Sequence, residues 1–256
     1  MKSLLAFIRK EMLEQRRSGK MIILGILFIA LGIMSPAIAK MTPWLMEMMA
    51  DTLAGSGLIF TSVSVSAMDS WTQFFKNMPI GLIAFVLIES SIFTREYQTG
   101  TLVLSLTKGL ERHKVVAAKT VILVILWTIC YWLCAGITCG YTAFFWDNAI
   151  LQHLLFSLAC WWVFGLFAVA LMVLFSTMAG SNTGVLAGTG SVVLGCYLLS
   201  FFSRLKKIMP TMLMDGTSLI YGMAKPDIYT VPLIIAAVMI PVCIAVSVIA
   251  FNRKQL

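Results

Sequence analysis

Long apolar runs of about 20 residues, almost free of charge, alternate along the chain with shorter polar segments. An α-helix rises about 1.5 Å per residue, so a run of this length crosses the roughly 30 Å hydrocarbon layer of a membrane. Six such runs lie at residues 21–39, 74–93, 120–145, 153–178, 184–202 and 230–251. The pattern predicts an all-α integral membrane protein with six transmembrane helices.

The first 20 residues have a different pattern, in which apolar and basic positions separate onto opposite sides of a helix. The apolar side carries Leu4, Leu5, Ile8 and Met12, with Phe7 at its edge. The other side carries Lys2, Arg9, Lys10, Arg16 and Arg17, and Leu13 is an exception to the separation. This pattern predicts an amphipathic helix over residues 1–20 that lies in the membrane interface, with its basic side toward anionic lipid headgroups.

Two longer segments between predicted spans, 40–73 and 203–229, are expected to lie outside the membrane. Residues 52–68 carry no charge and approach the minimum length of a span. Their Ser, Thr and Gly content weakens insertion, and counting them as a span would reverse the side on which 95–119 lies. We therefore interpret 40–73 as an external segment, which can include a helix on the outer membrane surface.

Composition agrees with a membrane protein, because 60% of the 256 residues are apolar and 12% are charged, against about a quarter charged in soluble domains. The net charge of +8 fits the excess of Lys and Arg that keeps loops in the cytoplasm better than it fits nucleic-acid binding. With the N-terminus inside, 13 of the 19 Lys and Arg residues fall on the cytoplasmic side. This count predicts that both termini and residues 95–119 are cytoplasmic.

Small residues recur at helical spacing in two predicted spans. Gly136 and Gly140 are four residues apart, and Gly180, Gly184 and Gly188 continue the same spacing into the fifth span. Such repeats favour close packing between transmembrane helices. They indicate a packed bundle without identifying the neighbours.

The sequence offers no set of catalytic or metal-ligating residues. It has no G-x-x-x-x-G-K-[ST] loop for nucleotide phosphates, and neither H-E-x-x-H nor G-x-S-x-G occurs. The six cysteines all lie in predicted spans and are expected to be small buried residues, with neither disulfides nor a metal. An intramembrane enzyme is therefore disfavoured.

Glu89 is the one carboxylate well inside a predicted span. A charge at that depth is costly, so the side chain faces protein, water or the interface. Two interpretations remain open. Glu89 is a gate or subunit-contact residue, or it lies near the interface and reaches the headgroups.

The segment after the second span has a recognisable order of residues. Glu96 is followed by Gly100-Thr101-Leu102, then by Leu104, Leu106, Arg112 and Lys119. This order resembles the permease family of type-2 ABC transporters, which also has a basic entry helix and six spans. Glu111 stands where the family usually has Ser, and Lys108-Gly109 where a Pro is common, which bears on the substrate subgroup.

The resemblance implies a single transmembrane permease domain over 1–256 that has no nucleotide site of its own. Two copies of a cytosolic ABC ATPase would bind ATP and Mg, and a second permease protomer would complete a transporter in a plasma membrane of bacterial type. Membrane lipid is a further expected partner, and nucleic acid is not.

The resemblance also implies that 95–119 couples the spans to the ATPase. The expected coupling residues are Glu96, Gly100, Thr101, Leu102, Leu104, Leu106 and Arg112. A short helix with an apolar face suits a groove on a partner, Gly100 suits the turn out of the span, and Thr101 suits a helix cap. Alternatively, Leu102–Leu106 lie along the membrane surface and the basic residues only hold the loop inside.

The apolar spans and the external Met and aromatic residues favour export of a hydrophobic or amphipathic substrate, such as a peptide or an antimicrobial. The alternative is a non-transporting membrane sensor or immunity protein, which needs no ATPase partner. Co-purification of an ATPase distinguishes the two.

Overall fold

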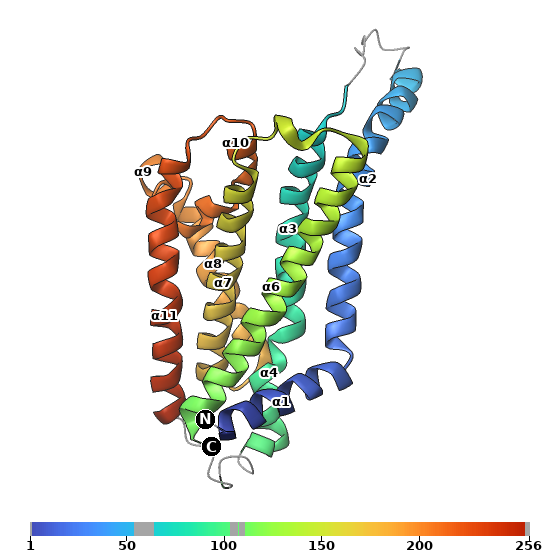
Figure 1. The fold of residues 1–256 in the computed structure, drawn as a ribbon. Helices are drawn as coiled ribbons and strands as arrows, with labels where there is room; N and C mark the ends of the chain where they lie inside the picture. The colour runs from blue at the N-terminus through green and yellow to red at the C-terminus, as the bar shows by residue number, and fades with distance from the viewer. Residues whose placement is uncertain (1, 54–63, 103–106, 108–110, 254–256) are drawn as a thin grey trace.

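The computed structural model describes residues 2–53, 64–102, 107 and 111–253. Every regular element within these residues is helical, and the long helices stand side by side in one bundle (Figure 1). They are α2 (Lys20–Leu53), α3 (Ala67–Glu89), α6 (Arg112–Phe145), α7 (Leu154–Met178), α8 (Asn182–Leu199) and α11 (Thr230–Arg253). Six helical segments are long and apolar enough to cross a membrane, which confirms the predicted all-α membrane fold.

The N-terminal helix, the short helix after the second span and the C-terminal end of the last helix all lie at one end of the bundle. The helix α1 (Lys2–Arg17) crosses this end, and the chain turns into α2 at Gly19, where φ is +74° (Figure 1). The short helix α4 (Ser91–Thr99) and the last turn of α11 lie at the same end. We call it the α1 end of the bundle.

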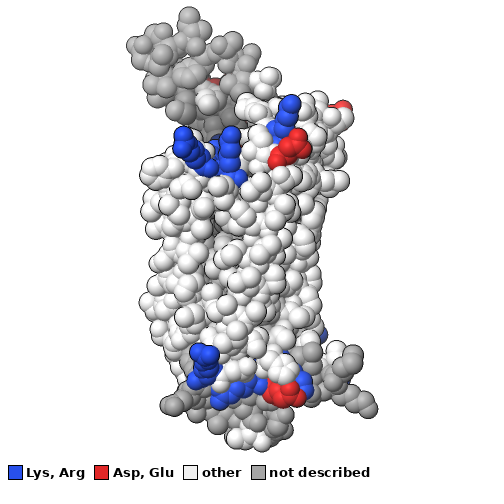
Figure 2. Space-filling view, turned by 90° about the vertical axis from the view of Figure 1, so that its left-hand side faces the viewer, with Lys and Arg blue, Asp and Glu red and all other residues white. Residues whose placement is uncertain are grey.

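Charged side chains gather at the two ends of the molecule. On the face seen in Figure 2, Lys and Arg form a group at each end, and the band between the groups is free of charge. An uncharged band between two charged ends is the surface that a bilayer requires of a spanning protein.

The helices α2 and α3 are longer than the predicted spans. α2 continues 14 residues past the predicted end at residue 39, through Pro36 and Pro43. α3 begins at Ala67, where the Ser66 N–H donates to Asp69 Oδ2 at 2.8 Å and satisfies a free backbone group of the first turn. Most of the surface helix considered for 52–68 lies outside the described residues.

The bundle core is built around Trp127 of α6. Its indole ring lies 5.4 Å from the ring of Phe85 and 6.0 Å from that of Phe28, edge to face in both cases. Gly165 of α7 makes room for it, because a Cβ there would lie 2.0 Å from Trp127 Cζ2. The Trp127 Nε1–H donates to the Trp162 carbonyl at 3.2 Å, so the buried indole has a partner.

The predicted glycine repeats contribute less to this packing than the single glycine at 165. A Cβ at Gly136 or Gly140 would meet none of the described residues within 4 Å. In the second repeat, Gly188 lies close against the Phe175 ring. Of the cysteines, Cys139 is exposed, which corrects the expectation that all six are buried.

The predicted external segment 203–229 is a packed cap over the opposite end. It contains α9 (Ser203–Lys206), the 3₁₀ turn η3 (Pro210–Met214), α10 (Gly216–Ile220) and the 3₁₀ turn η4 (Pro226–Tyr229). The turn η3 packs on both α7 and α11, α10 packs on α7, and η4 packs on α11. The Trp161 Nε1–H donates to the Met214 carbonyl at 3.0 Å, and Leu213 and Leu219 are fully buried. A further 3₁₀ turn, η2 (Asn148–Ile150), joins α6 to α7.

Candidate functional site

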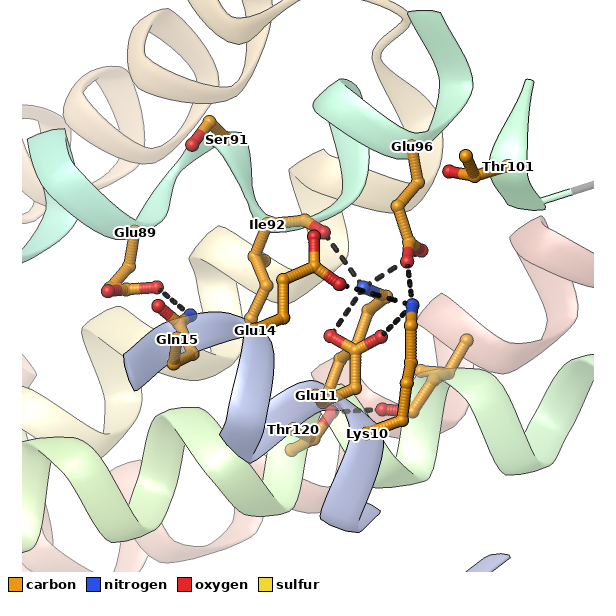
Figure 3. A network of polar contacts seen from close by, with 12 residues as sticks. Lys10, Glu11, Glu14, Gln15, Glu89, Ser91, Ile92, Glu96, Thr101 and Thr120 are labelled. Atoms are coloured by element: carbon orange, nitrogen blue, oxygen red, sulfur yellow. Dashed lines mark hydrogen bonds and ion pairs between the residues drawn. The ribbon is translucent and has the colours of Figure 1, made fainter. Parts of the chain in front are cut away.

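Three segments meet at the α1 end of the bundle: α1, the joint between α3 and α4, and the first turns of α6. The joint lies at Ser90, where the helix of the second span is interrupted before α4 begins. Figure 3 shows the charged side chains that the three segments direct toward one another. We call Lys10, Glu11, Glu96 and Lys119 the ion network.

Lys119 is the centre of the ion network and is 1% exposed. Its Nζ lies 2.9 Å from Glu11 Oε2 on α1 and 2.9 Å from Glu96 Oε2 on α4. It also donates to the Ile92 carbonyl at 2.9 Å. A buried ammonium group is tolerated only when it is paired in this way, so Lys119 joins α6 to both of the other helices.

Lys10 is the partly exposed member of the ion network, and it contacts both Glu11 and Glu96. Its Nζ lies 2.7 Å from Glu96 Oε1 and 3.0 Å from Glu11 Oε1, with Glu14 Oε2 at 3.2 Å. Partial burial opposes its charge, but the hydrogen bond to Glu96 and the charges of Glu11 and Glu96 outweigh it and raise the pKa of Lys10 well above its usual value. Lys10 is therefore charged at physiological pH.

Three carboxylates of this region, on Glu11, Glu14 and Glu96, approach within 4.8 Å of one another. Such a group can hold a metal ion. Here the ammonium groups of Lys10 and Lys119 lie among the carboxylates at 2.7–3.2 Å and supply the positive charge. The arrangement is that of an ion-pair cluster.

Glu89 lies beside the ion network and is fully buried. Gln15 of α1 donates its Nε2–H to Glu89 Oε2 at 2.6 Å, and Lys20 Nζ is 3.8 Å from the same oxygen. Lys20 also donates to Ser91 Oγ at 2.9 Å. Of the two interpretations left open by the sequence, contact with headgroups is therefore wrong, because the carboxylate faces protein.

α1 has three sides rather than the predicted two. Phe7, Glu11 and Gln15, each one turn after the last, are buried against the bundle. The apolar residues Leu5 and Leu13 are 63% and 45% exposed, so they face away from the protein. The buried side of α1 is thus largely polar, and its apolar side is left for lipid.

Two of the predicted coupling residues lie inside the protein. Glu96 contacts Lys10 and Lys119. Leu102 is 1% exposed and belongs to the core, so it does not offer an apolar face to a partner. The predicted residues Leu104 and Leu106 lie outside the described residues.

The other predicted coupling residues, Gly100, Thr101 and Arg112, lie at the end of α4 and at the start of α6. Gly100 ends α4 with φ +66°, which confirms the turn predicted there. Thr101 is exposed, and its hydroxyl lies 3.0 Å from that of Thr99. Arg112 Nη1–H donates to the carbonyls of Phe251 at 2.9 Å and Asn252 at 3.3 Å, which ties the start of α6 to the end of α11.

A family model described as "ABC-2 family transporter protein" matches residues 5–256. The chain belongs to this family. The match confirms the resemblance drawn from residues 96–119, and it makes the chain the membrane-spanning permease subunit of an ABC transporter. No curated protein matches the chain.

Membership in the family implies that the permease associates with an ABC ATPase. Two members of the ion network, Glu96 and Lys119, lie within 95–119, the segment in which the sequence predicts coupling. Glu96 is four residues ahead of Gly100, which is about one helical turn. Charge thus joins the two ends of the predicted coupling segment to each other and to α1.

Proposed function

We propose that this permease exports a hydrophobic or amphipathic substrate, such as a peptide or an antimicrobial. In this proposal two copies of a separate ATPase bind the ATP and Mg, and two permease protomers form the pathway. The α1 end faces the cytoplasm. The observation that carries the coupling mechanism is the ion network, because it links α4 to α1 and α6.

The geometry of α4 supports the proposed coupling step. This helix has nine residues between the joint at Ser90 and the turn at Gly100. A push on the segment after Gly100 reaches α4, whose Glu96 contacts both Lys10 of α1 and Lys119 of α6. The three helices therefore move together, and a movement of the ATPase reaches two spans at once.

The character of the substrate is supported by apolar surfaces of the permease. A groove of about 220 Å³ between α3, α7 and α8 is lined almost wholly by apolar side chains. Its lining includes Leu82, Val86, Leu186 and Val193, with Thr189 as the polar exception. At the opposite end, Phe201 and Met223 are 73% and 80% exposed. Such surfaces suit a cargo with apolar groups better than a sugar or an ion.

Reconstitution tests the proposal. The permease is purified with its ATPase in mild detergent and inserted into liposomes, and ATP hydrolysis is measured with amphipathic peptides, apolar antibiotics and, as controls, sugars. We expect hydrolysis to rise with the first two classes and to stay at the basal rate with sugars. Stimulation by sugars alone contradicts the substrate class, and failure to co-purify any ATPase favours the sensor or immunity function.

A further inference from the structure

The corner where α1 turns into α2 forms an open groove of about 620 Å³. Its lining residues are Leu13, Arg16 and Arg17 from α1 with Met21 and Ile22 from α2. The turn at Gly19 holds the two helices at an angle to each other (Figure 1). A groove of this volume lies within the range of sites that hold small molecules.

The polar wall of the groove carries two cations without a counter-charge. Arg16 and Arg17 are exposed, and no carboxylate among the residues that the structure describes lies within ion-pair distance of either. Glu14, the acidic residue nearest to them in sequence, is 3.2 Å from Lys10 Nζ and lines a different space. The planar guanidinium groups are therefore available for an anion, and the oxygens of a phosphate match their geometry.

The apolar wall continues out of the groove along the first span. Ile22, Ile26, Ile29 and Ile33 recur at three- and four-residue spacing on one side of α2 and are 39–64% exposed. At the groove itself, Leu13 is 45% exposed on α1. A ligand that fits the whole surface has an anionic head at the arginines and a long apolar chain parallel to α2.

The groove also lies at the membrane level that such a ligand requires. The candidate span begins at Lys20, directly after the turn, so α1 lies at the depth of the headgroups. The ion network fixes α1 against α4 and α6, and Lys20 at the start of α2 donates to Ser91 of α4. Both walls are therefore held in place, and the groove does not have to form when a ligand arrives. We propose that this corner binds one anionic glycerophospholipid, with its phosphate on Arg16 and Arg17 and an acyl chain on the α2 isoleucines. The lipid is a bound partner of the permease and not its cargo.

Native mass spectrometry of the full-length chain in mild detergent tests the proposal. Titration with phosphatidylglycerol and with phosphatidylcholine gives a Kd for the first lipid bound. The test variant is Arg16→Gln with Arg17→Gln, and the control is Arg204→Gln with Lys207→Gln, which removes the same charge at the opposite end. We expect the test variant to bind phosphatidylglycerol about 30-fold more weakly, as two lost cation contacts predict, and the control to match the wild type.

Further variants and a competition experiment distinguish a bound lipid from a free anion in the groove. Leu13→Gln should weaken long-chain phosphatidylglycerol more than a short-chain form, whereas Leu5→Gln, also on the exposed side of α1, should not. Equal competition by glycerol phosphate would show a free-anion site and overturn the proposal. Unchanged lipid binding in the Arg16 and Arg17 variant, with or without loss of the ATPase, overturns it as well. If that variant does not stay monodisperse, Arg17→Gln alone should weaken binding about fivefold.

Discussion

The replacement of Lys119 by Met tests whether the ion network holds the α1 end together. Met keeps most of the length of the side chain and removes the charge. Among the described residues, Lys10 is then the one cation within ion-pair distance of the buried Glu11 and Glu96. Removing one partner of a buried pair costs about 3–5 kcal/mol, because the charge left behind is uncompensated. We expect a loss of this size in resistance to unfolding by SDS.

A second substitution shows whether the loss comes from charge. Lys119→Met combined with Glu96→Gln restores charge balance, so the double variant should be more stable than the sum of the two single variants predicts, by about 0.5–3 kcal/mol. Lys114→Met is the control, because Lys114 pairs with the exposed Glu111 and should leave the SDS midpoint unchanged. Strictly additive single variants, or a Lys119→Met midpoint equal to that of the control, would refute the reasoning.

The dependence of the network on pH follows from the raised pKa of Lys10. A cation whose folded-state pKa lies above its unfolded value contributes its full stability at any pH below the unfolded value, which is about 10.4 for Lys. That contribution is lost only as the pH rises through the folded-state pKa. The contribution of Lys10 should therefore be the same at neutral pH and in mild alkali. A comparison of wild type with Lys10→Met in SDS titrations at several pH values measures it.

Three further predictions concern other parts of the permease. Gly100→Val should reduce substrate-stimulated hydrolysis with normal expression, because φ +66° is strained for a β-branched residue, and Gly100→Asn should retain more activity. Gly165→Ala should lower stability by about 1–3 kcal/mol in SDS titration, because the added Cβ overlaps the indole packed against it. In intact cells carrying Cys139→Ser, an impermeant thiol reagent should label Ser203→Cys and not Gln98→Cys, and the reverse result would contradict the proposed orientation.

The sequence predicts those features that depend on local spacing and on the properties of a membrane. Hydropathy finds all six spans because burial in lipid needs about 20 apolar residues wherever the helix lies in the chain. The turn at Gly100 is predicted because a left-handed residue favours Gly regardless of tertiary contacts. The C-terminal end of α2 and the N-terminal end of α3 are not predicted, since both helices continue there beyond the apolar run, and hydropathy detects only the run.

The ion network depends on tertiary packing and is not readable from spacing alone. Glu11 and Lys119 are 108 residues apart, and the sequence around neither residue indicates that the two side chains are in contact. A signal was nevertheless present, because Glu11 and Gln15 lie one turn apart on the same side of a helix otherwise divided into apolar and basic sides. The packing at Gly165 is not predicted for a similar reason, since a lone glycine gives no repeat. The repeat at Gly136 and Gly140, by contrast, has no close neighbour among the residues that the structure describes.

The polar side of α1 also explains how an interfacial helix stays attached to a bundle in lipid. An apolar side would exchange protein contacts for acyl chains at little cost, because lipid tails are as apolar as Leu. Acyl chains cannot replace the polar contacts of Glu11, Gln15 and Lys119. Separating α1 from the bundle would therefore leave charges unpaired in an apolar surrounding. In the proposed coupling step, a push on the segment after Gly100 therefore displaces α1, α4 and α6 as one unit, because separating any of the three would leave a buried charge without its partner.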